Sequence, residues 1–519
     1  MHRISCGVAR APLIRAGLVA ALTAGACAPP TAPPIETAPE PLPELQREFR
    51  GLWVATVANI DWPSRSGLPA TQQQAELLSI LDRAASSGFN AIVLHVRPAA
   101  DAVYASAIEP WGAMLTGTQG GDPGWDPLAF AITEAHRRGL ELHAWINPFR
   151  AGNAADTARL AAGHVFRSRP EIVRVYGTQL WLDPGDPAAQ QHTLSVVGDI
   201  IARYDVDAIH LDDYFYPYPQ NAPSGGTLPF PDSVTYAQRG AGLSLDDWRR
   251  ANVDGFIERL YGFVHETRPG VKLGISPFGI WRPGNPPGVA GFDAYALIYA
   301  DARKWLVSGW VDYFAPQLYW SIAAPQQSFP ALLDWWLSQN PHGRHVWPGL
   351  AAYRVGDGTA SAYTVSEITA QVGVARQRGT HGHLLYNTTS TLTRSSGAVA
   401  AALQSAYSNR ALPPAYPWLD ATPPAPPSVE VAVAGNGVDV LVTPAAGEEL
   451  RWIVTRHRAG GRWITRTHRA RVEPITLVSG ATVDSVVVNG VDRAGNLSAP
   501  AGWSTVLAAS RSTLRTSQP

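Results

Sequence analysis

Two adjacent carboxylates, Asp212 and Asp213, stand in the segment of this sequence that is best suited to chemistry. The segment reads His210-Leu-Asp-Asp-Tyr-Phe-Tyr-Pro217, so aromatic residues follow the carboxylates directly and a proline turns the chain. Cleavage of a glycosidic bond requires an acid and a group that stabilises developing charge, and paired carboxylates supply both. Aromatic rings pack on the C–H faces of sugars. The pattern predicts a sugar site with Asp212 and Asp213 as catalytic groups and Tyr214 and Tyr216 as substrate contacts.

Two other interpretations of the carboxylate pair are open at this stage. Asp is common at turns, so the pair could be a helix cap and a surface charge. Together with His210, the two carboxylates could also bind a divalent ion, but no His-x-x-x-His or Glu-x-x-His pair supports a metal site. We therefore expect neither a metal nor a cofactor.

Strand-like runs alternate with amphipathic helical stretches from Arg47 to about Pro413, and these elements must position the pair. Such alternation is typical of βα units and a parallel sheet. Eight apolar runs are present, at residues 51–57, 91–97, 140–146, 208–212, 272–276, 313–317, 345–349 and 383–387. Eight strands favour a closed (β/α)8 barrel. The alternative, an open doubly wound sheet, is disfavoured because no glycine-rich dinucleotide fingerprint follows any run.

Two of the intervening helices have readable ends. Thr71 can cap a helix over Gln72 to Ser86, and Asp126 can cap a second helix over Pro127 to Arg138. A glycine follows each of these stretches, as expected where a helix ends before the next strand.

Strand register predicts which side chains face the inside of the barrel, where catalytic groups gather at the carboxyl-terminal strand ends. In the fourth run Ile209 and Leu211 point toward the helices, which places His210 and Asp212 inside. The same argument places inside the polar residues His95, Arg97, His143, Trp145 and Asn147. Burial of so many polar groups is costly unless they line a pocket, so we expect them to contact substrate. Asp101, after the second run, is the reserve candidate for a catalytic acid.

The N-terminus predicts export. Arginines precede the apolar run at residues 16–26, which is too short to span a bilayer but is typical of an export signal. Cys27 follows the small residues of that run and resembles the lipidated cysteine of a bacterial lipoprotein, although an ordinary secretory signal is the alternative. We expect a signal peptide at 1–26, a proline-rich tether at 27–46, and a location in the periplasm or at the cell surface. Ala28 follows the cysteine in place of the Asp that favours inner-membrane retention, so the outer membrane is the expected anchor.

Composition excludes other classes of partner. Lys and Arg total 41 against 42 for Asp and Glu, which gives a formal net charge of −1. No long basic run is present, so nucleic acid is not an expected partner. The only cysteines are Cys6 and Cys27, so we expect no disulfide within the mature chain.

The pattern changes after a proline-rich linker at residues 413–427. Period-two alternation at 429–433 and 437–442 predicts a β-sandwich, and residues 484–498 resemble the late strands of a fibronectin type III module. The predicted architecture is an α/β barrel domain at 47–412, then a small all-β fibronectin III-like sandwich at 428–508 and a disordered tail at 509–519.

Nine sequence blocks, in order between about residues 47 and 400, resemble the glycosyl-hydrolase-like 10 family. The blocks include Glu48-Phe-Arg-Gly-Leu-Trp-Val54, Val96-Arg-Pro-Ala-Ala-Asp-Ala-Val-Tyr104, Asn147-Pro-Phe-Arg150, the carboxylate segment at 210–217, Ser276-Pro-Phe-Gly279 and Pro316-Gln-Leu-Tyr-Trp320. The resemblance implies a TIM barrel on an exported or lipid-anchored bacterial protein that acts on peptidoglycan glycan strands stripped of stem peptides. It adds Gln317, Tyr319 and Trp320 as substrate contacts. Asp183 departs from the family pattern, in which Asn is expected before the proline.

Two mechanisms are open for the pair. By similarity to hexosaminidases that use the substrate's own N-acetyl group as nucleophile, Asp212 would hold the acetamide and Asp213 would be the general acid. In the competing mechanism Asp212 is a covalent nucleophile and Asp101 is the acid. Two rival functions are a non-catalytic glycan-binding lipoprotein and a peptidoglycan amidase, but an amidase needs a zinc site or a cysteine nucleophile that the sequence does not provide.

Overall fold

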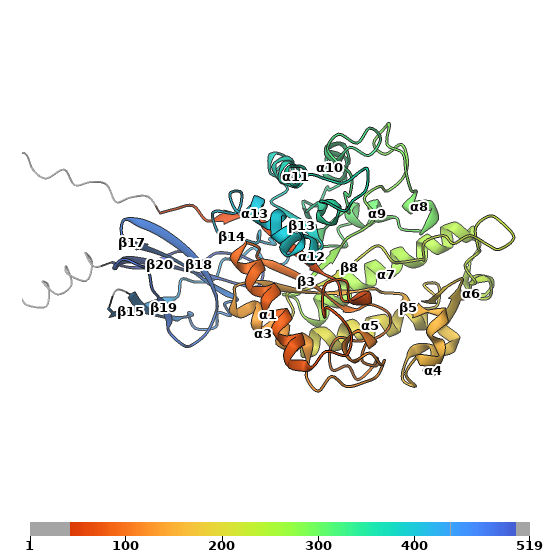
Figure 1. Cartoon of the computed structure of the whole chain (residues 1–519), viewed down its shortest axis with the longest axis horizontal. Coiled ribbons are helices and arrows are strands. Elements are labelled where there is room, and N and C mark those ends of the chain that lie inside the picture. The colour runs from red at the N-terminus through yellow and green to blue at the C-terminus, as the bar shows by residue number, and fades with distance from the viewer. Residues whose placement is uncertain (1–41, 436, 505–519) are drawn as a thin grey trace, which may run out of the picture. The chain divides into compact units, whose positions relative to one another are not determined.

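The computed structural model describes residues 42–435 and 437–504 (Figure 1). The predicted signal peptide, lipidated Cys27, most of the tether and the predicted tail lie outside these residues. Within the described ranges, no helix has both the length and the apolar character needed to cross a membrane.

Parallel strands form a barrel, and they coincide with the runs expected from the sequence. They are β2 (Phe49–Val54), β3 (Ala91–Arg97), β4 (Glu141–Ile146), β8 (Ala208–Leu211), β9 (Lys272–Ile275), β10 (Tyr313–Phe314), β11 (His345–Val346), β12 (Gly349–Ala351) and β13 (Gly382–Tyr386). Strands β11 and β12 are two parts of one segment, interrupted at Trp347 and Pro348 because proline has no N–H for the ladder. Since β11 pairs with β10 and β12 pairs with β13, the sheet closes. The predicted (β/α)8 TIM barrel is confirmed.

Helices surround the strands. The longer ones are α1 (Ala70–Ser86), α3 (Pro127–Arg137), α5 (Pro187–Arg203), α7 (Leu245–Thr267), α10 (Phe329–Ser338) and α11 (Val365–Gln377). The Asp126 side chain caps α3 by accepting a hydrogen bond from the Ala129 backbone N–H at 3.0 Å, as expected. The cap predicted at Thr71 is wrong, because α1 begins at Ala70 directly after Pro69. Alanine is the best helix former, so the helix starts at Ala70 and takes in Thr71.

Alternate strand residues face two different cores. Ile209 and Leu211 belong to the large core between the barrel and its helices. A separate cluster, which includes Trp53 and Tyr313, fills the barrel interior. The His210 side chain hydrogen-bonds both of them and therefore lies inside, as the strand register predicts.

The long connections that carry the site follow β4, β8 and β9. The first holds a small antiparallel sheet of β5 (Arg150–Asn153), β7 (Gln179–Leu182) and β6 (Val173–Tyr176), together with α4 (Val165–Ser168). The second and third hold α6 (Ser233–Arg239) and α8 (Ala294–Leu297). In Figure 1 these helices lie together on the right-hand side, at the carboxyl-terminal end of the barrel.

Residues after 428 form two antiparallel sheets. One contains β15 (Ser428–Ala434), β16 (Gly437–Thr443) and β19 (Ile475–Leu477), and the other contains β18 (Arg462–Arg469), β17 (Trp452–Ala459), β20 (Val483–Val491) and β21 (Ala501–Ser504). An apolar core with Val440, Ile453 and Val486 lies between them. The predicted small all-β module is confirmed, while the sequence limits proposed for each segment stay predictions.

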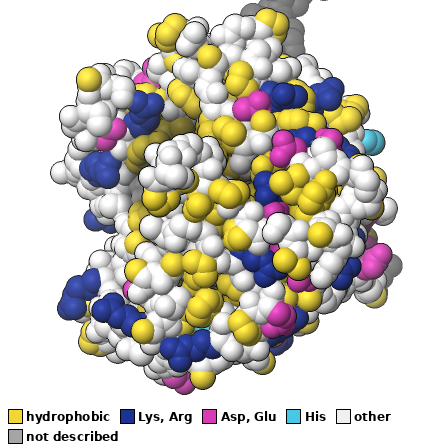
Figure 2. Space-filling view, turned by 90° about the vertical axis from the view of Figure 1, so that its right-hand side faces the viewer, with side chains coloured by type: hydrophobic (Ala, Val, Ile, Leu, Met, Phe, Trp, Pro, Cys, Tyr) yellow, Lys and Arg dark blue, Asp and Glu magenta, His cyan; other side chains and the backbone are white. Residues whose placement is uncertain are grey.

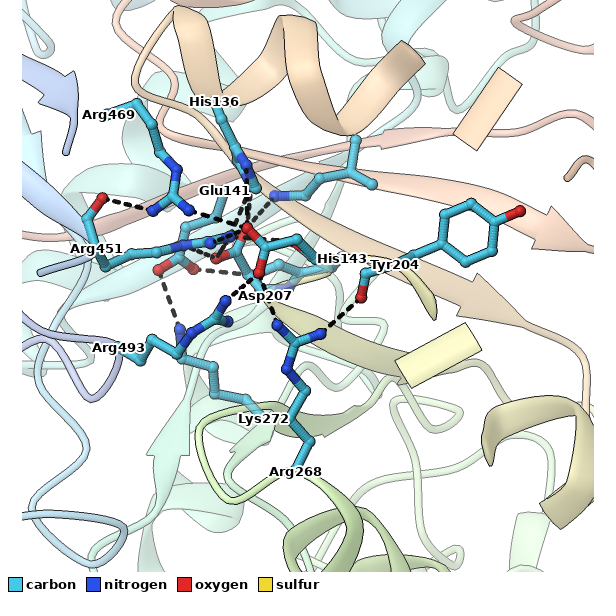
Figure 3. A network of polar contacts seen from close by, with 12 residues as sticks. His136, Glu141, His143, Tyr204, Asp207, Arg268, Lys272, Arg451, Arg469 and Arg493 are labelled. Atoms are coloured by element: carbon cyan, nitrogen blue, oxygen red, sulfur yellow. Dashed lines mark hydrogen bonds and ion pairs between the residues drawn. The ribbon is translucent and has the colours of Figure 1, made fainter. Parts of the chain in front are cut away.

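Ion pairs, of which Arg451–Asp207 is fully buried, join this β module to the amino-terminal end of the barrel (Figure 3). The Arg451 guanidinium donates to Asp207 at 2.8 Å and to Asp205 at 2.5 Å, just before β8. Arg469 donates to the same Asp205 carboxylate at 3.0 Å. The side chains of Arg451 and Asp207 are each only 1% exposed. Separation of the module from the barrel would leave the buried Asp207 carboxylate without its ion-pair partner, which is costly. These contacts therefore hold the module against the amino-terminal end of the barrel.

Candidate active site

A cavity of about 210 Å³ opens over the carboxyl-terminal ends of the barrel strands. Its lining comes from six strands or the residues that follow them and is mainly aromatic: Trp53, Trp145, Asp212, Asp213, Tyr214, Tyr218, Ser276, Phe278, Gln317, Tyr319 and Tyr386. Figure 2 looks onto the side of the molecule where the long connections lie, and it shows hydrophobic side chains in and around a hollow of the surface. Carboxylates surrounded by aromatic faces are suited to a sugar ring.

Asp212 is held from one side by β4. Its Oδ2 accepts hydrogen bonds from the Trp145 indole N–H at 3.0 Å and from the Asn147 side-chain amide, and Oδ1 accepts from the Tyr214 backbone N–H at 3.3 Å. Residues 145 and 147 point inward from β4 with period two, so they meet the first residue after the neighbouring strand β8. Burial raises the pKa of Asp212 to about 7, and the charge of Asp213 adds to this effect.

Asp213 faces the same cavity from the loop, although strand register alone does not point it inward. The Tyr218 hydroxyl donates to its Oδ2, and Gln317 hydrogen-bonds it from the segment after β10. Burial raises the pKa of this carboxyl as well. Two adjacent buried carboxyls hinder each other's ionisation, so the pair loses its two protons in separate steps. One group can therefore act as an acid while the other carries charge.

His95 stands behind the cavity wall. Its ring stacks on Trp145 with centroids 3.8 Å apart, and its Nε2 lies 3.0 Å from the Asn147 side-chain oxygen. Burial lowers the pKa of His95 to about 3, so the ring is neutral and Nε2–H donates to Asn147. That bond turns the Asn147 amide N–H toward Asp212. The predicted substrate contact at His95 is therefore corrected to a positioning contact, since the ring is covered by Trp145.

A chain of hydrogen bonds runs down the barrel axis from Trp53. The Trp53 indole N–H donates to His210 Nε2 at 3.1 Å, and His210 Nδ1–H donates to the Tyr313 hydroxyl at 2.9 Å. The Tyr313 hydroxyl donates to His143 Nδ1 at 2.8 Å, and His143 Nε2–H donates to Glu141 at 3.0 Å. An indole can only donate, and with neutral imidazoles every later bond then has the direction given. His143 and His210 thus lie beneath the cavity, and their predicted substrate contact is corrected to support of Trp53.

Arg97 is also a supporting residue. Its guanidinium forms a fully buried ion pair with Glu109, with N–O distances of 2.8 and 2.6 Å, and donates to the Asn147 backbone oxygen. His192 donates to Glu109 from α5 at 2.8 Å. Every polar group of Arg97 is thus engaged with the protein, so this side chain fixes the ends of β3 and β4 and does not reach the cavity.

Three further predictions also change. Tyr216 is 1% exposed and packs edge-on against Phe230 and Tyr299 in a neighbouring aromatic pocket, because the loop turns its ring away from the cavity. Trp320 does not line the cavity but packs edge-on behind Phe278, with centroids 5.7 Å apart. Asp101 lines a separate, larger cavity that includes neither Asp212 nor Asp213. Gln317 and Tyr319, in contrast, line the cavity.

Asp183, the departure from the family pattern, is a structural carboxylate. It accepts a hydrogen bond from Thr235 at 2.7 Å and forms an ion pair with Arg174 at 2.9 Å. Asp183 is fully buried and joins β7 to α6, outside the cavity.

Sequence reasoning missed several lining residues: Trp53, Tyr218, Ser276, Phe278 and Tyr386. Inward register of the first and eighth strands gives a signal for Trp53 and Tyr386. Ser276 and Phe278 stand in one of the resemblance blocks, whereas Tyr218 follows the carboxylate segment in a loop whose path the sequence does not give. Among the described residues, no group of three or more His, Cys, Asp or Glu side chains is arranged to hold a metal ion.

Comparison with known proteins assigns the chain to a family. The model of the family Glycosyl hydrolase-like 10 matches residues 48–364. Glycosyl hydrolase YngK of Bacillus subtilis (strain 168) is 39% identical over 397 residues, which cover 74% of this chain and 77% of YngK. Glycosyl hydrolase DigH of Escherichia coli (strain K12) is 34% identical over 336 residues, which cover 60% of this chain and 75% of DigH.

Among solved structures, the glycoside hydrolase domain of PgaB (BpsB) from Bordetella bronchiseptica aligns with a TM-score of 0.47 and 15% identity. This alignment covers 72% of this chain and 100% of that domain. Because the family model spans more than half of the sequence and YngK is matched over most of its length, this chain belongs to the glycosyl hydrolase-like 10 family and is a glycoside hydrolase.

Proposed function

We propose that this protein is an exported, lipid-anchored enzyme that cleaves the N-acetylated glycan strands of peptidoglycan where stem peptides have been removed. The observation that carries the proposal is the pair of buried carboxyls, Asp212 and Asp213, in a cavity lined by aromatic rings. Aromatic faces suit pyranose rings, and a carboxyl pair whose pKa values are raised by burial suits acid-assisted glycosidic cleavage. The sequence around Cys27 supports export and an anchor in the outer membrane.

In the proposed mechanism the substrate's acetamide is the nucleophile. Asp213 donates its proton to the glycosidic oxygen, the acetamide oxygen attacks the anomeric carbon, and the shortened glycan leaves as an alcohol. The acetamide N–H donates a hydrogen bond to Asp212 and so favours its ionised form, which leaves the proton of the pair on Asp213. The Asp212 carboxylate then stabilises the positive charge of the cyclic intermediate. Asp213 then takes a proton from water, which opens the ring. The fixed donors from Trp145 and Asn147 support this role because they hold one Asp212 oxygen and orient the other toward the cavity.

The covalent alternative has weaker support, because Asp101 lies in another cavity. Azide separates the two mechanisms: it should rescue an Asp212→Ala variant as a glycosyl azide only if Asp212 is a covalent nucleophile. A thiazoline mimic of the cyclic intermediate should inhibit only if the acetamide takes part. Rescue by azide without inhibition by thiazoline would overturn the proposed mechanism.

The substrate is tested by incubating the purified protein with intact sacculi and with sacculi stripped by an amidase, followed by mass analysis of the soluble products. We expect new reducing ends chiefly from stripped sacculi. Asp212→Asn and Asp213→Asn should each reduce their release by at least about a hundredfold. Binding without new reducing ends would instead support the rival function, a non-catalytic glycan-binding lipoprotein.

The anchor is tested separately. Metabolic labelling with a fatty acid should label the wild-type protein, and a Cys27→Ser variant should lose the label. Fractionation of the envelope should then place the wild type in the outer membrane. A labelled Cys27→Ser variant, or an unlabelled wild type, would exclude a lipid anchor at Cys27 and would support an ordinary secretory signal instead.

A further inference from the structure

A second cavity, of about 640 Å³, lies at the same end of the barrel. It is lined by residues that follow β3 and β4: Ala99, Asp101, Ala113, Gly117, Thr118, Gln119, Gly152, Asn153, Asp156, Arg159 and Leu160. The volume falls within the range of about 300–1,000 Å³ that is typical of small-ligand sites. Unlike the lining of the Asp212 cavity, its lining contains no aromatic ring.

Asp101 is the buried polar group of this second cavity. It is 4% exposed, and its oxygens accept from the Ala99 backbone N–H at 3.1 Å and from the Gln119 amide at 3.4 Å. Ala100 holds a left-handed backbone conformation, with φ of 52°, which a non-glycine residue adopts only where its surroundings require it. Burial raises the pKa of Asp101 to about 6, so its carboxyl can donate to or accept from a sugar hydroxyl.

Arg159 supplies an accessible positive charge in the lining. Its side chain is 87% exposed, and its contact with a carboxylate is the 3.9 Å pair with Asp156. An exposed pair of this length is easily exchanged for another partner. A guanidinium binds a carboxylate with two parallel hydrogen bonds, so Arg159 is suited to an acidic group on a ligand.

The two cavities lie within reach of one glycan strand. Asn147 contacts Asp212, and Asn153, six residues later, lines the second cavity. Six residues span at most about 20 Å even when fully extended. Arg97, the last residue of β3, also donates to the Asn147 backbone oxygen. Asp101 lies four residues after Arg97, in the loop that follows β3. The two cavities are therefore close enough for a strand of a few sugars to span the distance between them.

We propose that the cavity around Asp101 is a remote sugar subsite, in which Arg159 binds the free carboxylate that a muramic acid residue exposes once its stem peptide is removed. In an intact strand that group is an amide carrying a peptide, so it offers no charge to Arg159 and adds bulk. Asp101 hydrogen-bonds a hydroxyl of the same sugar. This inference rests on the proposed function and assigns Asp101 to binding, which removes it from the role of catalytic acid.

Binding is measured first, in a catalytically silent Asp213→Asn protein, by calorimetry with stripped glycan oligosaccharides and with chitin oligosaccharides of equal length. Chitin lacks the acidic group. We expect Arg159→Ala to weaken binding of the stripped glycan about tenfold and to leave chitin binding unchanged. Arg137→Ala is the matched control, because Arg137 is 63% exposed on α3 and lines neither cavity. Equal effects of Arg159→Ala on both ligands, or no effect on either, would overturn the proposal.

Kinetics then separate binding from catalysis. In the active enzyme, Asp101→Asn and Arg159→Ala should raise KM for long stripped strands and leave kcat unchanged, with no effect on short oligosaccharides that fill only the Asp212 cavity. A fall in kcat of about a hundredfold on the short substrate would identify Asp101 as the acid instead. If the enzyme cleaves stripped strands and Arg159→Ala changes neither binding nor KM, the subsite proposal is overturned and the proposed function stands. If it binds stripped strands through Arg159 but cleaves none, the proposed function fails and the subsite stands.

Discussion

Replacement of Asn147 by leucine tests how the structure controls the charge on Asp212. Asn147 donates to Asp212 and accepts from His95, and its hydrogen bond lowers the pKa of a carboxyl that burial raises to about 7. Asn147→Leu keeps the size of the side chain and removes the donor. The pKa of Asp212 must then rise, because the ionised form loses a partner.

The magnitude follows from the strength of that bond. A hydrogen bond to a charged group contributes about 1.5–3 kcal/mol, and about 1.4 kcal/mol corresponds to one pH unit. In the proposed mechanism Asp212 works ionised, so activity falls as the pH drops below its pKa. We expect the acidic limb of kcat/KM to move upward by about one to two pH units. At pH 7, where about half of Asp212 is ionised in the wild type, the variant should lose about five- to fiftyfold in activity and regain part of it in more alkaline buffer.

The assay is kcat/KM for soluble stripped glycan oligosaccharides, measured across pH for the wild type and the variant. Asn90→Leu is the control, because Asn90 is a buried asparagine that donates to the Glu48 and Ala411 backbone oxygens, away from the cavity. Asn90→Leu should reduce stability without moving the acidic limb. An unshifted limb in Asn147→Leu, or an equal loss at every pH, would show that Asn147 does not control the charge on Asp212.

Three further predictions follow from other contacts. Tyr313→Phe leaves two imidazole nitrogens without hydrogen-bond partners, so the free energy of unfolding should fall by about 1–3 kcal/mol for each. KM should also rise, because Trp53 is held less firmly. An unchanged urea midpoint would contradict the hydrogen-bond chain. Arg451→Met leaves Asp207 without its main ion pair, so urea unfolding should show a loss of about 3 kcal/mol, whereas a stability equal to wild type would mean that the ion pair is not needed. Tyr218→Phe removes the hydroxyl donor to the second carboxylate, so kcat should fall about tenfold while KM changes little; intact kcat in this variant would exclude that contact from catalysis.

Local patterns in the sequence were sufficient to predict the barrel and to place one of its catalytic candidates. The eight apolar runs became the strands of the closed sheet, since hydrophobic periodicity is a local property. Period two also placed Ile209 and Leu211 in the outer core and sent Asp212 to the inner face. The cap at Asp126 was likewise predictable, because it depends on a few adjacent residues.

Which of the inward polar residues reach the cavity depends on how the whole chain packs. Strand register predicts whether a side chain points into the barrel, but not how far along the barrel axis it lies. His143 and His210 were therefore predicted to contact substrate, although they lie beneath Trp53. Loop paths placed Asp213 and Tyr218 together and separated Asp101 from both, because long connections fold against neighbours distant in sequence. The raised pKa values of the pair have the same origin, since burial in the assembled cavity, not the order of residues, disfavours the carboxylate charge.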